Sequence, residues 1–222
     1  INKSLDNTRS FNADAEENQA EEYSFTFSKG ISQKLINGVN KTYGTKTNEV
    51  LLTALGLAAG QISGNPVGII VESHGRTELH KPIATEKTVG WFTTCYPVVI
   101  NNNNNVTTEI VNVKNAMRKI PKNGVEYLLL NNCFHNNANI KFNYYKNNIS
   151  NENRENKLVD FNGSSSVFPN MINVSCSVAD DILSMFITVP ICKHKKGISE
   201  ELGKEFIKQI EKIIESANIL PA

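Results

Sequence analysis

The residues best suited to chemistry lie at the end of a short apolar run. The run from Val67 to Val71, bounded by Pro66 and Gly75, predicts a buried strand, and the polar stretch Glu72-Ser-His-Gly-Arg76 follows it. In open α/β sheets, reactive groups gather where strands end and loops begin. A carboxylate there suits proton transfer, because partial burial makes it a stronger base and a nearby arginine can orient it. The sequence therefore indicates a candidate reaction site at this strand end, with a structural ion pair between Glu72 and Arg76 as the other interpretation of the same residues.

The elements that must position this site follow from the spacing of apolar residues. A second strand is predicted from Trp91 to Ile100, which is rich in aromatic and β-branched residues. Alternating or apolar runs predict the other strands, at 23–27, 140–144, 171–178 and 182–189. Apolar residues at helical spacing predict helices that begin after the N-cap residues Ser28, Asn48 and Ser199, and another around 110–120.

The order of these elements predicts an α/β (α+β) fold with one open, mixed β-sheet covered by helices. Residues 1–21 are polar and acidic without periodicity, so we expect a partly disordered linker there and one folded domain from 22 to 222. Residues 146–167 are rich in Asn, Ser and Gly, which predicts a long loop. A chain of 222 residues is long enough for one sizeable core.

Composition excludes several classes of partner. A net charge of +1 gives no basic footprint for nucleic acid, and no apolar run approaches the roughly 18 residues of a membrane span. The four cysteines are scattered without CxxC spacing, so we expect reduced thiols in the cytoplasm and no bound metal. The chain begins with Ile1 rather than Met, and we expect an internal segment of a longer protein.

Four motifs give a resemblance to a known family. Residues 72–76 resemble the EGHGRE motif of epimerization domains from nonribosomal peptide synthetases, and residues 88–97 are similar to the RTVGWFTxxYP motif of the same family. Residues 49–56 resemble its DxLLxAxG helix, with Glu in place of Asp, and Phe142-Asn-Tyr resembles the start of FNYLG. The resemblance covers about 23–217 and concerns the C-terminal half of such a domain.

The resemblance implies a fold and a reaction. Epimerization domains consist of two chloramphenicol-acetyltransferase-like halves, so this chain is expected to be one half-domain. The implied reaction inverts the α-carbon of an aminoacyl or peptidyl thioester. No cofactor is expected to bind directly, because the substrate is carried on the phosphopantetheine arm of a peptidyl carrier protein. Further implied partners are the N-terminal half of the domain and the neighbouring synthetase modules.

Two residues are assigned catalytic roles by this resemblance. Glu72 is expected to be an acid–base, and Tyr144 to donate a hydrogen bond to the enolate oxygen. The residues alone leave other interpretations open: Glu72 in a structural ion pair with Arg76, and Tyr144 as a core aromatic. The expected supporting residues are His74, Arg76, Asn143 and Trp91. Strand alternation predicts that His74 faces the same side as Glu72, and we expect a structural histidine there and packing roles for Trp91 and Phe92.

The sequence also departs from the family pattern. The HHxxxDG motif of the N-terminal half is missing, so this chain lacks one acid–base group and is expected to be inactive by itself. Glu126 and Leu128 replace glycines of the PxxGxGYG motif, and Tyr145-Lys146 replaces the end of FNYLG. Two alternatives therefore stay open: a non-catalytic condensation-like module that docks a carrier protein, and a condensation domain that forms peptide bonds. Residues 88–97 argue against the second.

Overall fold

The chain folds around one six-stranded sheet. The computed structural model describes residues 15–64, 66–76, 87–101, 105–130, 138–146, 171–192 and 196–219. The strand order across the sheet is β1-β6-β5-β4-β2-β3. The strands are β1 (Ala15–Thr26), β2 (Val67–Ser73), β3 (Thr94–Ile100), β4 (Ala138–Lys146), β5 (Ile172–Ala179) and β6 (Ile182–Cys192).

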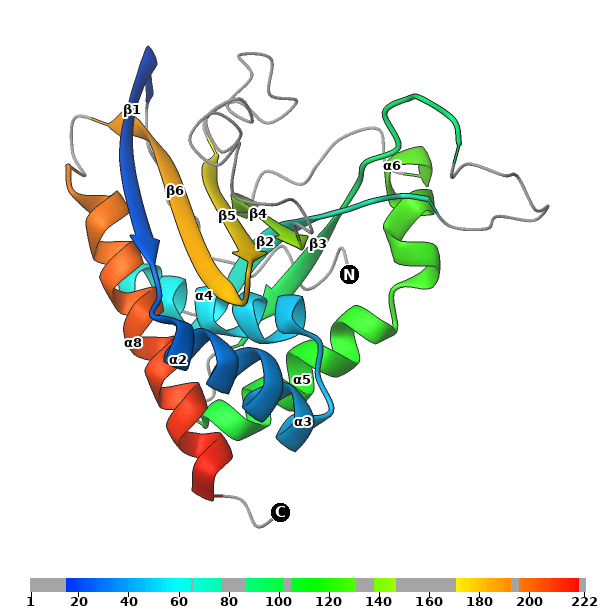
Figure 1. Cartoon of the computed structure of the whole chain (residues 1–222). Coiled ribbons are helices and arrows are strands. Elements are labelled where there is room, and N and C mark those ends of the chain that lie inside the picture. The colour runs from blue at the N-terminus through cyan, green and yellow to red at the C-terminus, as the bar shows by residue number, and fades with distance from the viewer. Residues whose placement is uncertain are drawn as a thin grey trace.

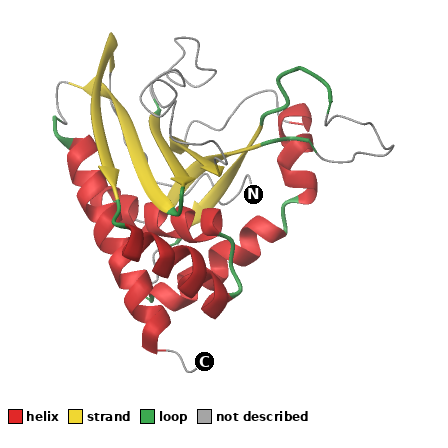
Figure 2. Cartoon of the chain, viewed as in Figure 1, coloured by secondary structure: helices red, strands yellow, loops and turns green. Residues whose placement is uncertain are grey.

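The helices are gathered on one side of this sheet (Figures 1 and 2). They are α2 (Lys29–Gln33), the π-helix η1 (Lys34–Val39), α3 (Asn40–Tyr43), α4 (Thr47–Ser63), α5 (Val106–Arg118), the 3-10 helix η2 (Pro121–Gly124), α6 (Val125–Leu130) and α8 (Ile198–Ile219). None of these described helices has the length and hydropathy needed to cross a membrane.

The strand pairing is mixed, as the sequence predicted. β4 pairs in parallel with both β2 and β5, whereas β3, β6 and β1 join the sheet through antiparallel pairs. The predicted antiparallel pair near the end of the chain is confirmed as β5 and β6. Asp180 and Asp181 connect them, and both have positive φ, which matches the right-handed twist of a two-residue hairpin.

The two faces of the sheet differ in composition. The face that carries Ile69, Val71, Ile140 and Phe142 packs on α4, α5 and α8 and forms the main core; we call it the helix face. Alternation places Glu72, Lys141 and the other intervening residues on the opposite side, which we call the polar face. A small second cluster of buried residues lies on that side, made of Ile70, Cys95, Ala138 and Met171.

Close packing of α4 on the sheet depends on a glycine. Gly56 lies in the middle of α4, and a Cβ atom built there would come within 2.2 Å of the Ile100 side chain on β3. No side chain fits in that space, so the helix approaches the sheet closely only because residue 56 has none. This packing explains the glycine of the motif at residues 49–56 in physical terms.

The first helix start confirms the sequence prediction. Ser28 is the N-cap of α2, with its hydroxyl oxygen accepting from the Ile31 amide at 3.4 Å. Gly44 ends α3 in the left-handed conformation.

The predicted caps Asn48 and Ser199 are wrong. α4 begins one residue before Asn48, and Glu49 accepts a hydrogen bond from the Lys46 amide at 2.8 Å. Ser199 lies inside α8. The cap of this helix comes from strand β1, where the Glu21 carboxylate accepts a hydrogen bond from the Gly197 amide at 2.9 Å. A carboxylate satisfies the free amides of a helix start as well as a local serine or asparagine does.

Two strand boundaries also differ from the predictions. β1 begins at Ala15, inside the segment expected to be a linker. This segment is rich in polar residues, but its backbone pairs with β6. Residues 1–14 lie outside the described part of the chain. β3 begins at Thr94 rather than Trp91, since the pairing with β2 ends at Ser73. Most of the predicted loop 146–167 lies outside the described residues.

Candidate active site

Glu72 lies near the end of β2, on the polar face of the sheet. Its neighbour Val71 belongs to the main core on the helix face, so alternation turns the Glu72 side chain to the other side. The side chain is 15% exposed. The predicted acid–base residue is therefore largely withdrawn from solvent at the end of a buried strand.

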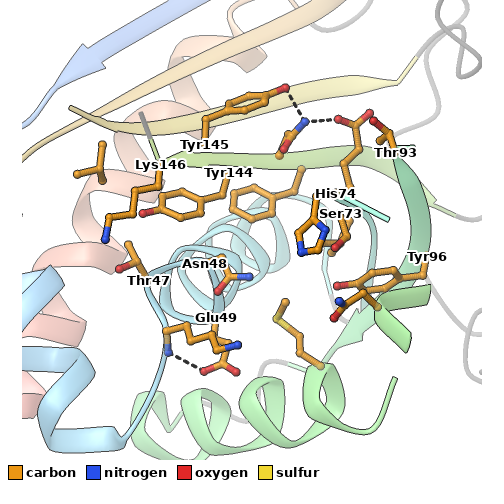
Figure 3. A pocket seen from close by; sticks show the side chains of 18 of the residues that line it. Thr47, Asn48, Glu49, Ser73, His74, Thr93, Tyr96, Tyr144, Tyr145 and Lys146 are labelled. Carbon is orange, nitrogen blue, oxygen red and sulfur yellow. Dashed lines mark hydrogen bonds between the residues drawn. The ribbon is translucent and has the colours of Figure 1, made fainter. Parts of the chain in front are cut away.

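Each oxygen of the Glu72 carboxylate has its own partner from β4. Lys141 Nζ lies 3.2 Å from Oε1, and the Asn143 amide nitrogen donates to Oε2. Asn143 also donates to the Tyr145 hydroxyl at 2.5 Å, and Figure 3 marks these hydrogen bonds of Asn143 with dashed lines. We call Glu72, Lys141, Asn143 and Tyr145 the carboxylate cluster. Its contacts fix both the orientation and the charge environment of Glu72.

Two neutral groups border this carboxylate. Burial, together with the negative charge of Glu72 and against the opposing hydrogen bond from Asn143, raises the pKa of the Tyr145 hydroxyl to about 12. Cys95, which is paired with Glu72 across β2 and β3, has its pKa raised to about 12 by burial, with a further contribution from Glu72 and an opposing one from Lys141. Both groups are therefore protonated at neutral pH, and Cys95 is unsuited to nucleophilic attack.

Tyr144 lies on the opposite face from Glu72. Figure 3 shows Tyr144 and Tyr145 pointing to opposite sides of β4. Tyr144 packs against the main core; burial raises the pKa of its hydroxyl, and a hydrogen bond with Thr47 opposes that shift. The sequence predicted Glu72 and Tyr144 in one site. Both residues line one pocket, but their side chains leave the sheet on opposite faces, and Tyr145 is the tyrosine linked to Glu72 through Asn143.

The motifs at residues 72–76 and 88–97 meet at Gly75. Gly75 has φ of 60°, and a Cβ atom there would lie 1.7 Å from the Phe92 carbonyl oxygen. Only glycine allows this turn and this contact. The guanidinium carbon of Arg76 lies 4.2 Å from the centre of the Phe92 ring, and its Nη2 donates to the Thr88 carbonyl at 3.2 Å. This packing holds residues 88–92 beside the end of β2.

The supporting residues show two differences from expectation. β2 ends at Ser73, so strand alternation does not carry His74 to the side of Glu72; its Nδ1 accepts from the Arg76 amide at 3.1 Å, as a structural histidine would. Trp91 is 89% exposed, so its predicted packing role is wrong: it precedes β3 and the chain there has left the sheet. His80, His135 and His194 lie outside the described residues.

A second buried carboxylate borders the site from the helix layer. Glu49 of α4 is 3% exposed and accepts from Arg118 Nε at 3.0 Å and Nη2 at 3.2 Å. Arg118 also donates to the Gly44 carbonyl at 2.7 Å. Together with the bond from the Lys46 amide, these contacts tie the start of α4 to the end of α5, so Glu49 has a structural role.

An open pocket of about 1180 Å³ connects these groups. Its lining includes Glu72, His74, Asn143, Tyr144, Tyr145 and Glu49. The size is ample for an aminoacyl or peptidyl group. Across the described ranges, no group of three or more His, Cys, Asp or Glu side chains is placed to hold a metal ion.

The condensation-domain family matches residues 5–217. The chain belongs to this family. Among curated relatives of this condensation-family chain, bacitracin synthase 1 of Bacillus licheniformis is 28% identical over 201 residues, which are 83% of this chain and 4% of the synthase. Bacitracin synthase 2 of the same organism is 38% identical over 108 residues, 47% of this chain and 4% of that protein. The chain thus spans a small fraction of these relatives.

Solved structures of condensation-like domains share the fold. The epimerization domain from the third module of tyrocidine synthetase B has a TM-score of 0.73 and 24% identity, covering 95% of this chain and 51% of that one. The first condensation domain of the CDA synthetase has a TM-score of 0.63 and 14% identity, covering 100% of this chain and 51% of that one. The predicted open mixed sheet of a condensation-like half-domain is confirmed.

Sequence reasoning missed Lys141 and Tyr145 in this condensation-family site. Both follow from alternation along β4, where residues 141, 143 and 145 share the polar face. What the sequence did not reveal is that β4 pairs directly with β2, with Ile70 opposite Lys141 and Val71 opposite Phe142. Only this pairing brings Lys141 and Asn143 to the two oxygens of Glu72. Among the described residues, the ion pair to Glu72 comes from Lys141, whereas the sequence had left open an ion pair with Arg76.

Proposed function

We propose that this chain is the C-terminal half of an epimerization domain in nonribosomal peptide synthesis. It acts on an aminoacyl or peptidyl thioester carried by the phosphopantetheine arm of a peptidyl carrier protein. The observation that carries this proposal is Glu72, a largely buried carboxylate at a strand end, held by Lys141 and Asn143 and open to a pocket. The motif at residues 88–97 and the likeness to the tyrocidine epimerization domain support it.

In the proposed reaction, Glu72 exchanges a proton with the α-carbon of the thioester. When the carboxylate acts as base, the Cα–H bond breaks, an O–H bond forms on Glu72, and the electron pair moves into the thioester as an enolate. Return of a proton to the opposite face of Cα restores the thioester with inverted configuration. No oxidant or reductant is needed, because one proton leaves and one arrives.

The opposite face requires a second acid–base group. By resemblance, this is a histidine of the N-terminal half, which the present sequence lacks. The likeness to about half of a solved epimerization domain, 51% of that chain, agrees with such a division. The role of Tyr144 as a donor to the enolate stays a prediction; its side chain lines the same pocket from the helix face.

The test is α-proton exchange in the complete protein that contains this chain. A carrier protein loaded with an aminoacyl thioester is incubated in D₂O, and deuterium at the α-carbon is followed by mass spectrometry. Glu72→Gln keeps the shape of the side chain and removes the base, so exchange is expected to fall about 100-fold or more. Glu200→Gln, a change in an exposed ion pair with Lys204, is the matched control and should leave exchange unchanged.

Retention of exchange in a folded Glu72→Gln protein would remove Glu72 from the reaction. Circular dichroism of both variants is compared with that of the unmodified protein, so that loss of exchange is not loss of fold. Chirality of the released amino acid is read in parallel, because epimerization must change it and simple enolization need not.

A second function is favoured by two specific features. Condensation domains share the fold with TM-scores similar to that of the epimerization domain, and Glu126 and Leu128 alter a glycine motif. A condensation-like module that docks a carrier protein without chemistry would bind the loaded carrier in a titration and show no exchange. A condensation domain would instead form a peptide bond between two loaded carriers.

A further inference from the structure

We propose that Lys141 is a positioning residue that holds Glu72 as an oriented carboxylate for proton transfer. This inference rests on the proposed function and extends it to a residue outside the motifs that support the resemblance, which begin at Phe142 in this strand. Lys141 does not touch the substrate in this proposal. It acts through Glu72.

The first observation is the geometry of the contact. Lys141 and Asn143 are two residues apart on β4 and therefore project from the same face, towards Glu72 on the paired strand β2. Lys141 Nζ lies 3.2 Å from one carboxylate oxygen and Asn143 donates to the other. Asn143 alone leaves the carboxylate free to turn about one bond, whereas the two contacts together fix the plane of the carboxylate.

The second observation is burial. Lys141 is 20% exposed and Glu72 is 15% exposed, so both charges are largely removed from water. A charge in such a place is costly unless an opposite charge compensates it. Without the Lys141 ammonium, the Glu72 carboxylate would lose both that compensation and the contact that holds its Oε1 oxygen. The burial of the pair therefore supports a role for Lys141 in holding Glu72.

The third observation is the chemistry of the other neighbours. Cys95 from β3 and Tyr145 from β4 border Glu72; burial, with a contribution from Glu72, raises the pKa of both to about 12, so both are neutral and neither offsets the carboxylate charge. Asn143 is neutral. Within the part of the chain that the structure describes, the ion pair to Glu72 therefore comes from Lys141. In this proposal, proton transfer by Glu72 therefore depends on the ammonium group of Lys141.

The experiment measures exchange kinetics for three variants at position 141 in the complete protein with a loaded carrier protein. Lys141→Met removes the charge and the donor, Lys141→Gln keeps a donor without charge, and Lys141→Arg keeps both. We expect kcat for α-proton exchange to fall about tenfold or more in the Met and Gln variants and to recover to within about threefold in the Arg variant. The KM for the loaded carrier should stay unchanged, because Lys141 reaches Glu72 rather than the carrier.

The controls separate this inference from the proposed function. Lys204→Met removes an exposed lysine of α8 and should leave exchange at the unmodified rate. Full exchange in folded Lys141→Met and Lys141→Gln, with exchange lost in Glu72→Gln, would overturn the role of Lys141 and leave the proposed function standing. Full exchange in Glu72→Gln would remove Glu72 from the reaction and with it the role of Lys141, and no exchange in the unmodified complete protein would overturn the proposed function as well.

Discussion

The two faces of the sheet at the ends of β2 and β4 use neighbouring residues for opposite purposes. On the helix face, Val71, Phe142 and Tyr144 join a continuous apolar core under α4, α5 and α8. On the polar face, Glu72 and Asn143, each next in sequence to one of those residues, form the carboxylate cluster. Strand alternation alone separates the residues that hold the fold together from those proposed to do chemistry.

This difference teaches why the site occurs at this place in the fold. The core residues of β2 and β4 fix the two strands against each other, and the parallel register then determines which polar side chains meet on the other face. A carboxylate in a flexible loop would lack this support. The precision of the site is therefore a consequence of packing on the opposite side of the same strands.

The largest expected effect is a loss of stability when a core residue of the helix face is replaced. Phe206 of α8 is fully buried, and Phe206→Ala should lower the free energy of unfolding by about 3–5 kcal/mol through lost burial and the cavity left behind. Phe186, which alternation places on the polar face of β6, is the matched control, because it is only partly buried and Phe186→Ala should cost clearly less. Urea unfolding followed by circular dichroism measures both, and equal losses would contradict the comparison.

A smaller effect reports on the charges of the polar face. Cys95 has a raised pKa, to which Glu72 contributes in the raising direction and Lys141 in the lowering direction. Glu72→Gln should therefore lower the pKa of Cys95, increase its thiolate fraction and speed its alkylation several-fold at about pH 9, whereas Lys141→Met should slow it. Peptide mass spectrometry after iodoacetamide treatment measures the rate at Cys95 separately from the other cysteines. Equal rates in both variants would show that these charges do not act on this face.

Local patterns in the sequence predicted much of the fold. The apolar run of β2, the hairpin of β5 and β6, and the apolar stripe of α8 depend on residues close in sequence, and each is confirmed. The place of Glu72 at a strand end was predictable for the same reason. These features need no knowledge of which elements become neighbours.

The errors arose where distant segments interact. β1 extends to Ala15 because β6 pairs with it, and α8 takes its N-terminal carboxylate from Glu21 on that strand. The carboxylate cluster depends in the same way on the pairing of β2 with β4. No local pattern in the sequence contains these pairings, so Lys141 and Tyr145 were missed.

The most direct test of the account compares two glutamates that line one pocket. Glu72→Gln and Glu49→Gln each remove a buried, ion-paired carboxylate, the first from the polar face and the second from the helix layer. α-Proton exchange and the free energy of unfolding are measured for both in the complete protein. We expect Glu72→Gln to abolish exchange while the fold persists. Glu49→Gln should retain exchange in the folded protein and lose about 1.5–3 kcal/mol of stability, the usual worth of charged hydrogen bonds. Loss of exchange in Glu49→Gln with full exchange in Glu72→Gln would contradict the account.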